Sequence, residues 1–124
     1  MSAYLTVEDV ILIHDVMETA PMIDRGKLEG AVMRPQAGFG DQMLFPSIFS
    51  QASVLLHGVC QAHAFLDGNK RTAWISMLTF LARNGLEMPL LSPEDMTDYM
   101  VAVATKMHTE SDTAMWIADV AYPA

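Results

Sequence analysis

The chain has 124 residues, 52% of them apolar, and a mean hydropathy of +0.24. Such a composition can build one domain, residues 1–124, around a single core, and it excludes a disordered chain. The net charge of −8 excludes a surface suited to direct binding of nucleic acid, which depends on neutralising phosphates.

The cellular compartment can be predicted from three features. No apolar run is long enough to span a bilayer, and residues 1–10 lack the basic start and long apolar stretch of a signal peptide. The single cysteine, Cys60, cannot form an internal disulfide, which fits a reducing compartment. We therefore expect a cytoplasmic protein with no membrane partner.

The first third of the chain predicts two helices and a loop. The segment "TVED" is typical of a capping box that starts a helix at Thr6. A short helix is expected over residues 24–33, where Pro35 stops it. Residues 34–46 are rich in glycine and proline, which predicts a loop or a small hairpin. The residues that share one face of the first helix are Val7, Val10, Ile11, His14 and Met17.

Two longer helices follow. The first is predicted over residues 47–65, and the second runs from about Asn69 to the pair Asn84–Gly85, a typical C-terminal signal. The second helix is apolar on nearly all sides, which predicts that it is buried at the centre. The inner face of the first helix carries Ile48, Ala52, Leu55, Leu56 and Val59. The apolar residues of the second are Trp74, Ile75, Met77, Leu78, Phe80 and Leu81.

Two helices are also expected near the C-terminus. The segment "SPED" predicts a start with Ser92 as the cap and proline in the first turn. A last short helix in "ESDTAMWIADVA" is predicted to be capped by Ser111. No segment alternates as a strand would, so the fold class is all-α, a compact bundle of about six helices. The stripe of the first of these two helices is Met96, Tyr99, Met100, Val103 and Met107.

The stretch "HAFLDGNKRT", residues 63–72, concentrates chemically active groups. Helical periodicity predicts that His63 points inward from the end of the long helix. Gly68 permits a left-handed turn, and Asn69 is a favoured cap for the next helix. The N–H groups at a helix start can bind an anion, and Lys70 and Arg71 add positive charge there.

Together these residues describe a site for phosphate transfer. Asp67 stands beside the predicted anion site, and a carboxylate next to phosphates is what Mg²⁺ requires. The imidazole of His63 can accept a proton from an attacking hydroxyl near neutral pH. Each piece alone is ordinary, because a histidine on an apolar face, such as His14 or His108, is usually a core residue. The order and spacing of all the pieces favour the functional interpretation.

The same stretch resembles the signature of the Fic/Doc family, His-x-Phe-x-Asp/Glu-x-Asn followed by basic residues. The segments "ILIHDVM" and "DRGKLEGAVMRPQ" also resemble the first helix and the upstream segment of Doc-like chains, so the resemblance covers nearly the whole chain. Most Fic proteins have glycine where this chain has Lys70 and a second arginine where it has Trp74. These two departures resemble the Doc (death-on-curing) branch.

The resemblance implies a fold and a function. The fold would be the Fic/Doc-type helical bundle. Most Fic proteins transfer AMP from ATP to a protein hydroxyl, whereas Doc-type proteins transfer the γ-phosphate to a threonine of elongation factor Tu and so stop translation. The chain would then be the toxin of a toxin–antitoxin pair, with a Phd-like antitoxin as its partner. An AMP transferase and an inactive binding scaffold in an antitoxin complex remain the alternatives.

The resemblance also implies roles for particular residues. His63 would be the general base, and Asp67 would hold Mg²⁺ on the phosphates of ATP. Gly68 and Asn69 would shape the phosphate-binding turn, and Lys70 and Arg71 would bind the phosphates. Phe65 is expected to anchor the loop in the core. Residues 36–42 correspond to a region where Fic proteins dock a target, but a plain surface loop is the preferred interpretation of this segment.

Overall fold

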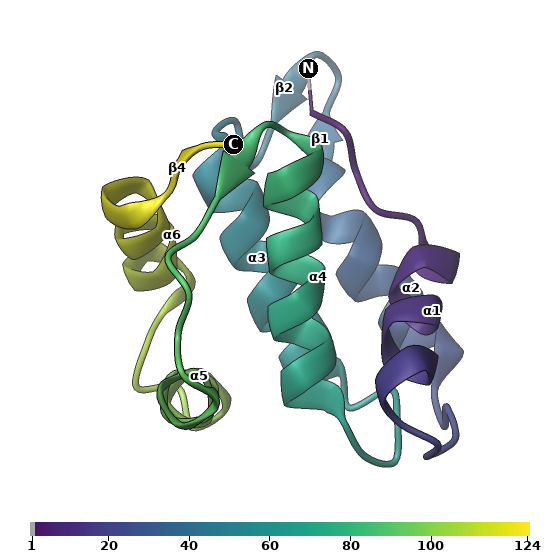
Figure 1. The fold of residues 1–124 in the computed structure, drawn as a ribbon. Helices are drawn as coiled ribbons and strands as arrows, with labels where there is room; N and C mark the ends of the chain where they lie inside the picture. Colours follow the sequence, from purple (N-terminus) through teal and green to yellow (C-terminus); the bar gives the residue numbers. More distant parts are fainter. Residues whose placement is uncertain (1) are drawn as a thin grey trace.

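The computed structural model describes residues 2–124 and confirms the predicted all-α class (Figure 1). Strands occur only as two short antiparallel pairs in the described part of the chain. The helices are α1 (Val7–Met17), α2 (Arg25–Met33), the 3₁₀ helix η1 (Arg34–Gln36), α3 (Ile48–Ala62), α4 (Asn69–Arg83), α5 (Pro93–Ala104) and α6 (Glu110–Val120). The strands are β1 (Gly38–Phe39), β2 (Gln42–Met43), β3 (Leu86–Glu87) and β4 (Tyr122–Pro123).

Two central helices organise the bundle. Helices α3 and α4 lie side by side, with α1 and α2 on one side and α5 and α6 on the other (Figure 1). The predicted inner face of α3 is buried apart from the half-buried Ile48, and α4 buries most of its apolar residues. Burial of this apolar surface is the main force that holds the bundle together. Within residues 2–124, no helix combines the length and the apolar character needed to cross a membrane.

Most of the predicted helix starts are confirmed. The Thr6 side chain accepts from the N–H of Asp9, whose carboxylate accepts from the N–H of Thr6, which is the predicted capping box. Ser92 caps α5 with Pro93 in its first turn. The predicted cap Ser111 is wrong, because Thr109 caps α6 and makes a second capping box with Asp112.

The predicted end of the long helix is also wrong. Helix α3 stops at Ala62, three residues early, because His63 adopts a left-handed backbone that cannot continue the helix. The carbonyl of Ala64 then accepts from the N–H groups of Ile23 and Asp24 at 2.7 and 3.1 Å. These contacts tie the loop after α3 to the segment before α2. The prediction that Met107 belongs to the apolar stripe of α5 is wrong, because α5 ends at Ala104 and Met107 is 75% exposed.

Short strand pairs occur in the segments between and after the helices. Strands β1 and β2 form the small hairpin that was one of two expectations for residues 34–46. Strands β3 and β4 join the end of α4 to residues 122–123 and were not predicted. A strand of two residues is too short to show alternation, so no pattern could have revealed it.

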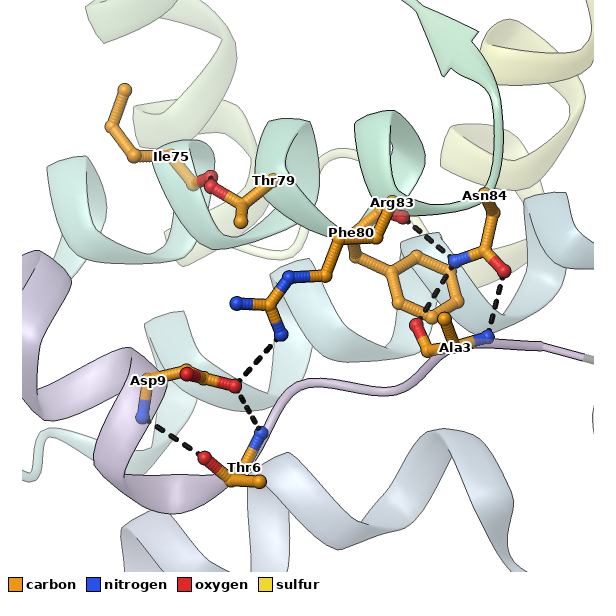
Figure 2. A network of polar contacts seen from close by, with 8 residues as sticks. All are labelled: Ala3, Thr6, Asp9, Ile75, Thr79, Phe80, Arg83 and Asn84. Carbon is orange, nitrogen blue, oxygen red and sulfur yellow. Dashed lines mark hydrogen bonds and ion pairs between the residues drawn. The ribbon is translucent and has the colours of Figure 1, made fainter.

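Polar contacts fix the N-terminal segment and α1 against the end of α4. Arg83 donates to the carboxylate of Asp9 at 2.8 Å (Figure 2). The side chain of Asn84 bonds both the N–H and the carbonyl of Ala3. These bonds and the buried residues Val10 and His14 hold α1 in place, and α1 in turn contributes to the site described next.

Candidate active site

A pocket of about 410 Å³ opens where α3 ends and α4 begins. Its wall combines the loop between these helices with residues from the end of α1 and from α5. Six residues that were predicted from the sequence line it together: His63, Asp67, Gly68, Asn69, Lys70 and Arg71. The structure therefore brings the predicted set to one place, while their chemical roles stay predictions.

The turn before α4 is built on Gly68. Its φ of +85° lies in the left-handed region, as the sequence predicted. Gly68 itself is the N-cap of α4, so the prediction of Asn69 as the cap is wrong. Asn69 is the first helical residue, and its side-chain amide bonds the N–H and the carbonyl of Phe65 at 3.1 and 2.8 Å. Asn69 therefore holds the loop closed.

The start of α4 remains open to an anion. No side chain among residues 2–124 caps the first turn of α4, and the N–H groups in the first turn of a helix have no partner within it. They carry a partial positive charge that favours phosphate. Lys70 and Arg71 are exposed and form no ion pair within residues 2–124. The free N–H groups and the two cations suit a polyphosphate.

His63 differs from its predicted placement. It was expected to point inward from the helix, but it follows α3 with φ +47° and ψ +43° and is exposed at the pocket wall. The left-handed backbone carries its side chain away from the buried face of α3. Neither ring nitrogen has a hydrogen-bond partner within residues 2–124. An imidazole in this position is accessible to a hydroxyl group that enters the pocket.

Asp67 is oriented by bonds on both sides. Its Oδ1 accepts from the N–H of Gly68 at 2.8 Å, and its backbone carbonyl accepts from Nε2 of His14 at 2.9 Å. The second carboxylate oxygen has no partner among the described residues. A carboxylate with one free oxygen beside a phosphate-binding turn fits the hard oxygen ligands that Mg²⁺ prefers.

A buried histidine, His14, supports the loop between α3 and α4 from the core. His14 is fully buried and stacks on Phe65 with ring centroids 3.7 Å apart. Phe65 is 1% exposed, which confirms that it anchors the loop in the core. The sequence marked His14 as an ordinary core histidine, and its support of the Asp67 carbonyl was missed because the two residues lie 53 positions apart.

The pocket also contains residues that sequence reasoning did not select. Glu18 comes from the end of α1, Cys60 from α3, and Met96 and Thr97 from α5. No local pattern marks them, because they meet the signature residues only through the packing of α1 and α5. Burial raises the pKa of the Cys60 thiol, an effect that the charge of Lys70 partly offsets, so the group stays a thiol rather than a reactive thiolate.

The spacing of His57, Cys60 and His63 could imitate a metal site in the sequence. In the structure, Nε2 of His57 bonds Oγ1 of Thr113 on α6 at 2.8 Å, so this imidazole is directed toward α6. Burial lowers the pKa of His57, which keeps it neutral. Within residues 2–124, no three His, Cys, Asp or Glu side chains converge in a way that could hold a metal ion.

The sequence was also compared with known protein families and characterised proteins. A family model described as "Fic/DOC family" matches residues 4–81. The chain is 37% identical over 109 residues to the protein named "Toxin Doc" of Mycolicibacterium smegmatis, covering 86% of this chain and 84% of that protein. It is 33% identical over 107 residues to "Protein kinase doc" of Escherichia phage P1, covering 82% of each chain.

Proposed function

Because the chain belongs to the Fic/DOC family, we propose that it is a Doc-like toxin that works as a protein kinase. It would transfer the γ-phosphate of ATP to a threonine hydroxyl of a translation factor, with elongation factor Tu as the proposed target in the cytoplasm. A Phd-like antitoxin would restrain it. The observation that carries the proposal is the single pocket that gathers all six predicted residues.

His63 acts as the general base in this proposal. An imidazole nitrogen accepts the proton of the threonine hydroxyl as its oxygen forms a bond to the γ-phosphorus. The bond between that phosphorus and the oxygen that bridges to the β-phosphate breaks, and ADP leaves with the bridging oxygen. His63 is exposed, and its ring forms no hydrogen bond with the residues that the structure describes, which supports this role.

The phosphates are held by the start of α4. Its free N–H groups, with Lys70 and Arg71, bind the phosphate oxygens and stabilise the charge that shifts to the leaving ADP. Asp67 would hold Mg²⁺ through its free oxygen. When bound, Mg²⁺ neutralises part of the phosphate charge.

Two positions favour phosphate transfer over AMP transfer. Lys70 places a long cation in the pocket where most Fic proteins have glycine. Trp74, which stands where they have a second arginine, is 5% exposed and packs near Tyr99 and Trp116, with ring centroids 6.2 and 6.1 Å away. This position therefore offers the pocket no second cation for the AMP-transfer arrangement.

The test asks which phosphate of ATP is transferred to the protein substrate. The purified chain is incubated with Mg²⁺, elongation factor Tu and ATP labelled at either the γ- or the α-phosphate. Transfer of the γ label alone is the expected result. Transfer of the α label would replace kinase activity by AMP transfer, and transfer of neither label would favour the inactive scaffold or a different target.

Two variants connect the transfer to the site. His63→Asn should abolish label transfer while the helical content and melting temperature stay close to those of the wild type, because asparagine tolerates the left-handed backbone at this position. Lys70→Ala should weaken ATP binding by about tenfold or more, the effect of losing one charged hydrogen bond of ~1.5–3 kcal/mol. Normal transfer by His63→Asn would remove His63 as the base, and unchanged binding by Lys70→Ala would remove Lys70 from the phosphate site.

A further inference from the structure

Glu18 brings a second carboxylate to the phosphate pocket, although it lies outside the signature stretch. It follows α1 as the C-cap residue, with an extended backbone, and it is half-buried. Its side chain runs alongside the turn at Gly68, where a methyl group on the glycine would lie only 3.2 Å from Glu18 Cγ. Glu18 therefore contacts the turn on which the phosphate site is built.

Glu18 and Asp67 share the same pattern of contacts. Oε1 of Glu18 accepts from the N–H of Thr19 at 3.0 Å and lies 3.4 Å from the N of Ala20. Oδ1 of Asp67 accepts from the N–H of Gly68. In each carboxylate, the second oxygen has no hydrogen-bond partner within residues 2–124. Backbone N–H groups thus orient two acids in one pocket and leave one oxygen of each available.

Neither acid is neutralised by a neighbouring cation. Lys70 and Arg71 line the same pocket, yet no ion pair joins them to Glu18 or Asp67 within the described residues. A second carboxylate repels a polyphosphate, because like charges repel one another. The two carboxylates become favourable only when a cation stands between them and the phosphates.

Mg²⁺ has the properties that this arrangement needs. It binds carboxylate and phosphate oxygens and retains several of its waters, so an acid can hold it directly or through one water. Acids that act through such waters also tune metal affinity strongly. The geometry points to Glu18 as a second acid that holds Mg²⁺ beside Asp67 and makes nucleotide binding depend on the metal. This inference rests on the proposed function in taking a nucleotide polyphosphate as the ligand and Asp67 as the first acid that holds Mg²⁺.

The test measures binding rather than transfer. Binding of an ATP analogue with a non-hydrolysable β–γ bridge is followed by calorimetry over a series of Mg²⁺ concentrations, for the wild type and for Glu18→Gln. The matched control is Glu87→Gln, which removes the same charge from the exposed strand β3. Glu87 lies beyond the far end of α4, a helix of 15 residues and therefore about 22 Å long.

Glu18→Gln should raise the Mg²⁺ concentration for half-maximal binding by about tenfold. It should also bind the analogue more tightly than the wild type when Mg²⁺ is absent, because one repelling charge is gone. Glu87→Gln should match the wild type in both measurements. A Glu18→Gln variant that matches the control, or that gains affinity equally with and without Mg²⁺, would overturn the assignment.

The result can be separated from the proposed kinase activity. Magnesium-dependent binding that Glu18→Gln weakens, without transfer of label to any protein, would refute the kinase function and leave the role of Glu18 intact. Label transfer together with binding that does not depend on Mg²⁺ in the wild type would refute the role of Glu18 alone.

Discussion

A single carboxylate near the N-terminus links two parts of the molecule. Asp9 closes the capping box of α1 with Thr6 and also accepts from Arg83 in the last turn of α4 (Figure 2). The hydrogen bond from Arg83, together with the bonds from Thr6, lowers the pKa of Asp9 from 3.8 to about 2. The ionised form is therefore favoured by folding.

Asp9→Asn should lower the free energy of unfolding by about 1 kcal/mol at pH 7. This is the usual cost of losing a helix-capping interaction and a partly exposed ion pair. Because the pKa of Asp9 is depressed in the folded state, its contribution is present above pH 3.8 and is lost as the pH falls toward about 2. The gap between wild type and variant should therefore close over this range, which denaturant unfolding at several pH values would measure.

Asp112→Asn is the matched control for this prediction. Asp112 occupies the same capping-box position in α6, and hydrogen bonds to Thr109 lower its pKa, but it has no arginine partner among the described residues. Its variant should lose less stability and show a weaker dependence on pH. An equal loss in the two variants would mean that Arg83 adds nothing to the cap.

Single residues show where sequence rules work and where they fail. Thr6 was found because a capping box is a local pattern. The same pattern identifies Thr109, which has Asp112 three residues later, whereas the predicted cap Ser111 has Ala114 at that distance. Glu18 had no such signal, since nothing in the sequence around it indicates that α1 ends beside the turn at Gly68.

At the scale of elements, the loop between α3 and α4 shows tertiary contacts overriding a local helical pattern. The apolar residues Ala64 and Phe65 continue the periodicity of α3, so the sequence extended that helix to residue 65. Both residues are indeed buried, but as part of a loop. The carbonyl of Ala64 accepts from the N–H groups of Ile23 and Asp24, and the backbone of Phe65 both donates to and accepts from the side chain of Asn69. These contacts satisfy the backbone of the loop outside a helix.

The turn that starts α4 should be sensitive to any side chain at Gly68. Gly68→Ala should lower the free energy of unfolding by more than the roughly 1–2 kcal/mol cost of a left-handed backbone. The added methyl would also lie 3.2 Å from Glu18 and 3.3 Å from His14. We expect it to weaken nucleotide binding as well. Denaturant unfolding and calorimetric titration with the ATP analogue would measure the two effects.

Gly85→Ala provides the control for this turn. Gly85 has a nearly identical φ of +82°, but a methyl group there would meet no atom of the described residues within 4 Å. Gly85→Ala should lose only the roughly 1–2 kcal/mol that a left-handed backbone costs a residue with a side chain. Its affinity for the nucleotide should equal that of the wild type. Equal losses in both variants would show that Glu18 and His14 move aside without cost.

At the scale of the whole molecule, contacts from α3 and α4 reach every other helix. Ser53 and His57 of α3 bond the carbonyl of Glu110 and the side chain of Thr113 on α6, at 2.6 and 2.8 Å. Arg34 reaches α6 through its ion pair with Glu110. The number of helices could be predicted from periodicity and capping residues. These hydrogen bonds and this ion pair join residues far apart in the chain, so no local sequence pattern predicts them.

This packing predicts that the chain unfolds as one domain. Denaturation should give a single transition with the same midpoint by far-ultraviolet circular dichroism and by tryptophan fluorescence. The two signals report different parts, because the helices span the chain while Trp74 and Trp116 lie on α4 and α6. Separate midpoints would show that α6 detaches before the central helices unfold.

The dependence of the active-site loop on α1 has a consequence for how related genes are interpreted. His14 supports the carbonyl of Asp67, and Glu18 lies against Gly68, yet both precede the ten-residue signature by more than forty positions. A gene copy that had lost its first twenty codons would still encode the complete signature. Its product would lack the helix that holds the loop in shape, so a match to the signature alone would identify the ancestry of such a copy and not its activity.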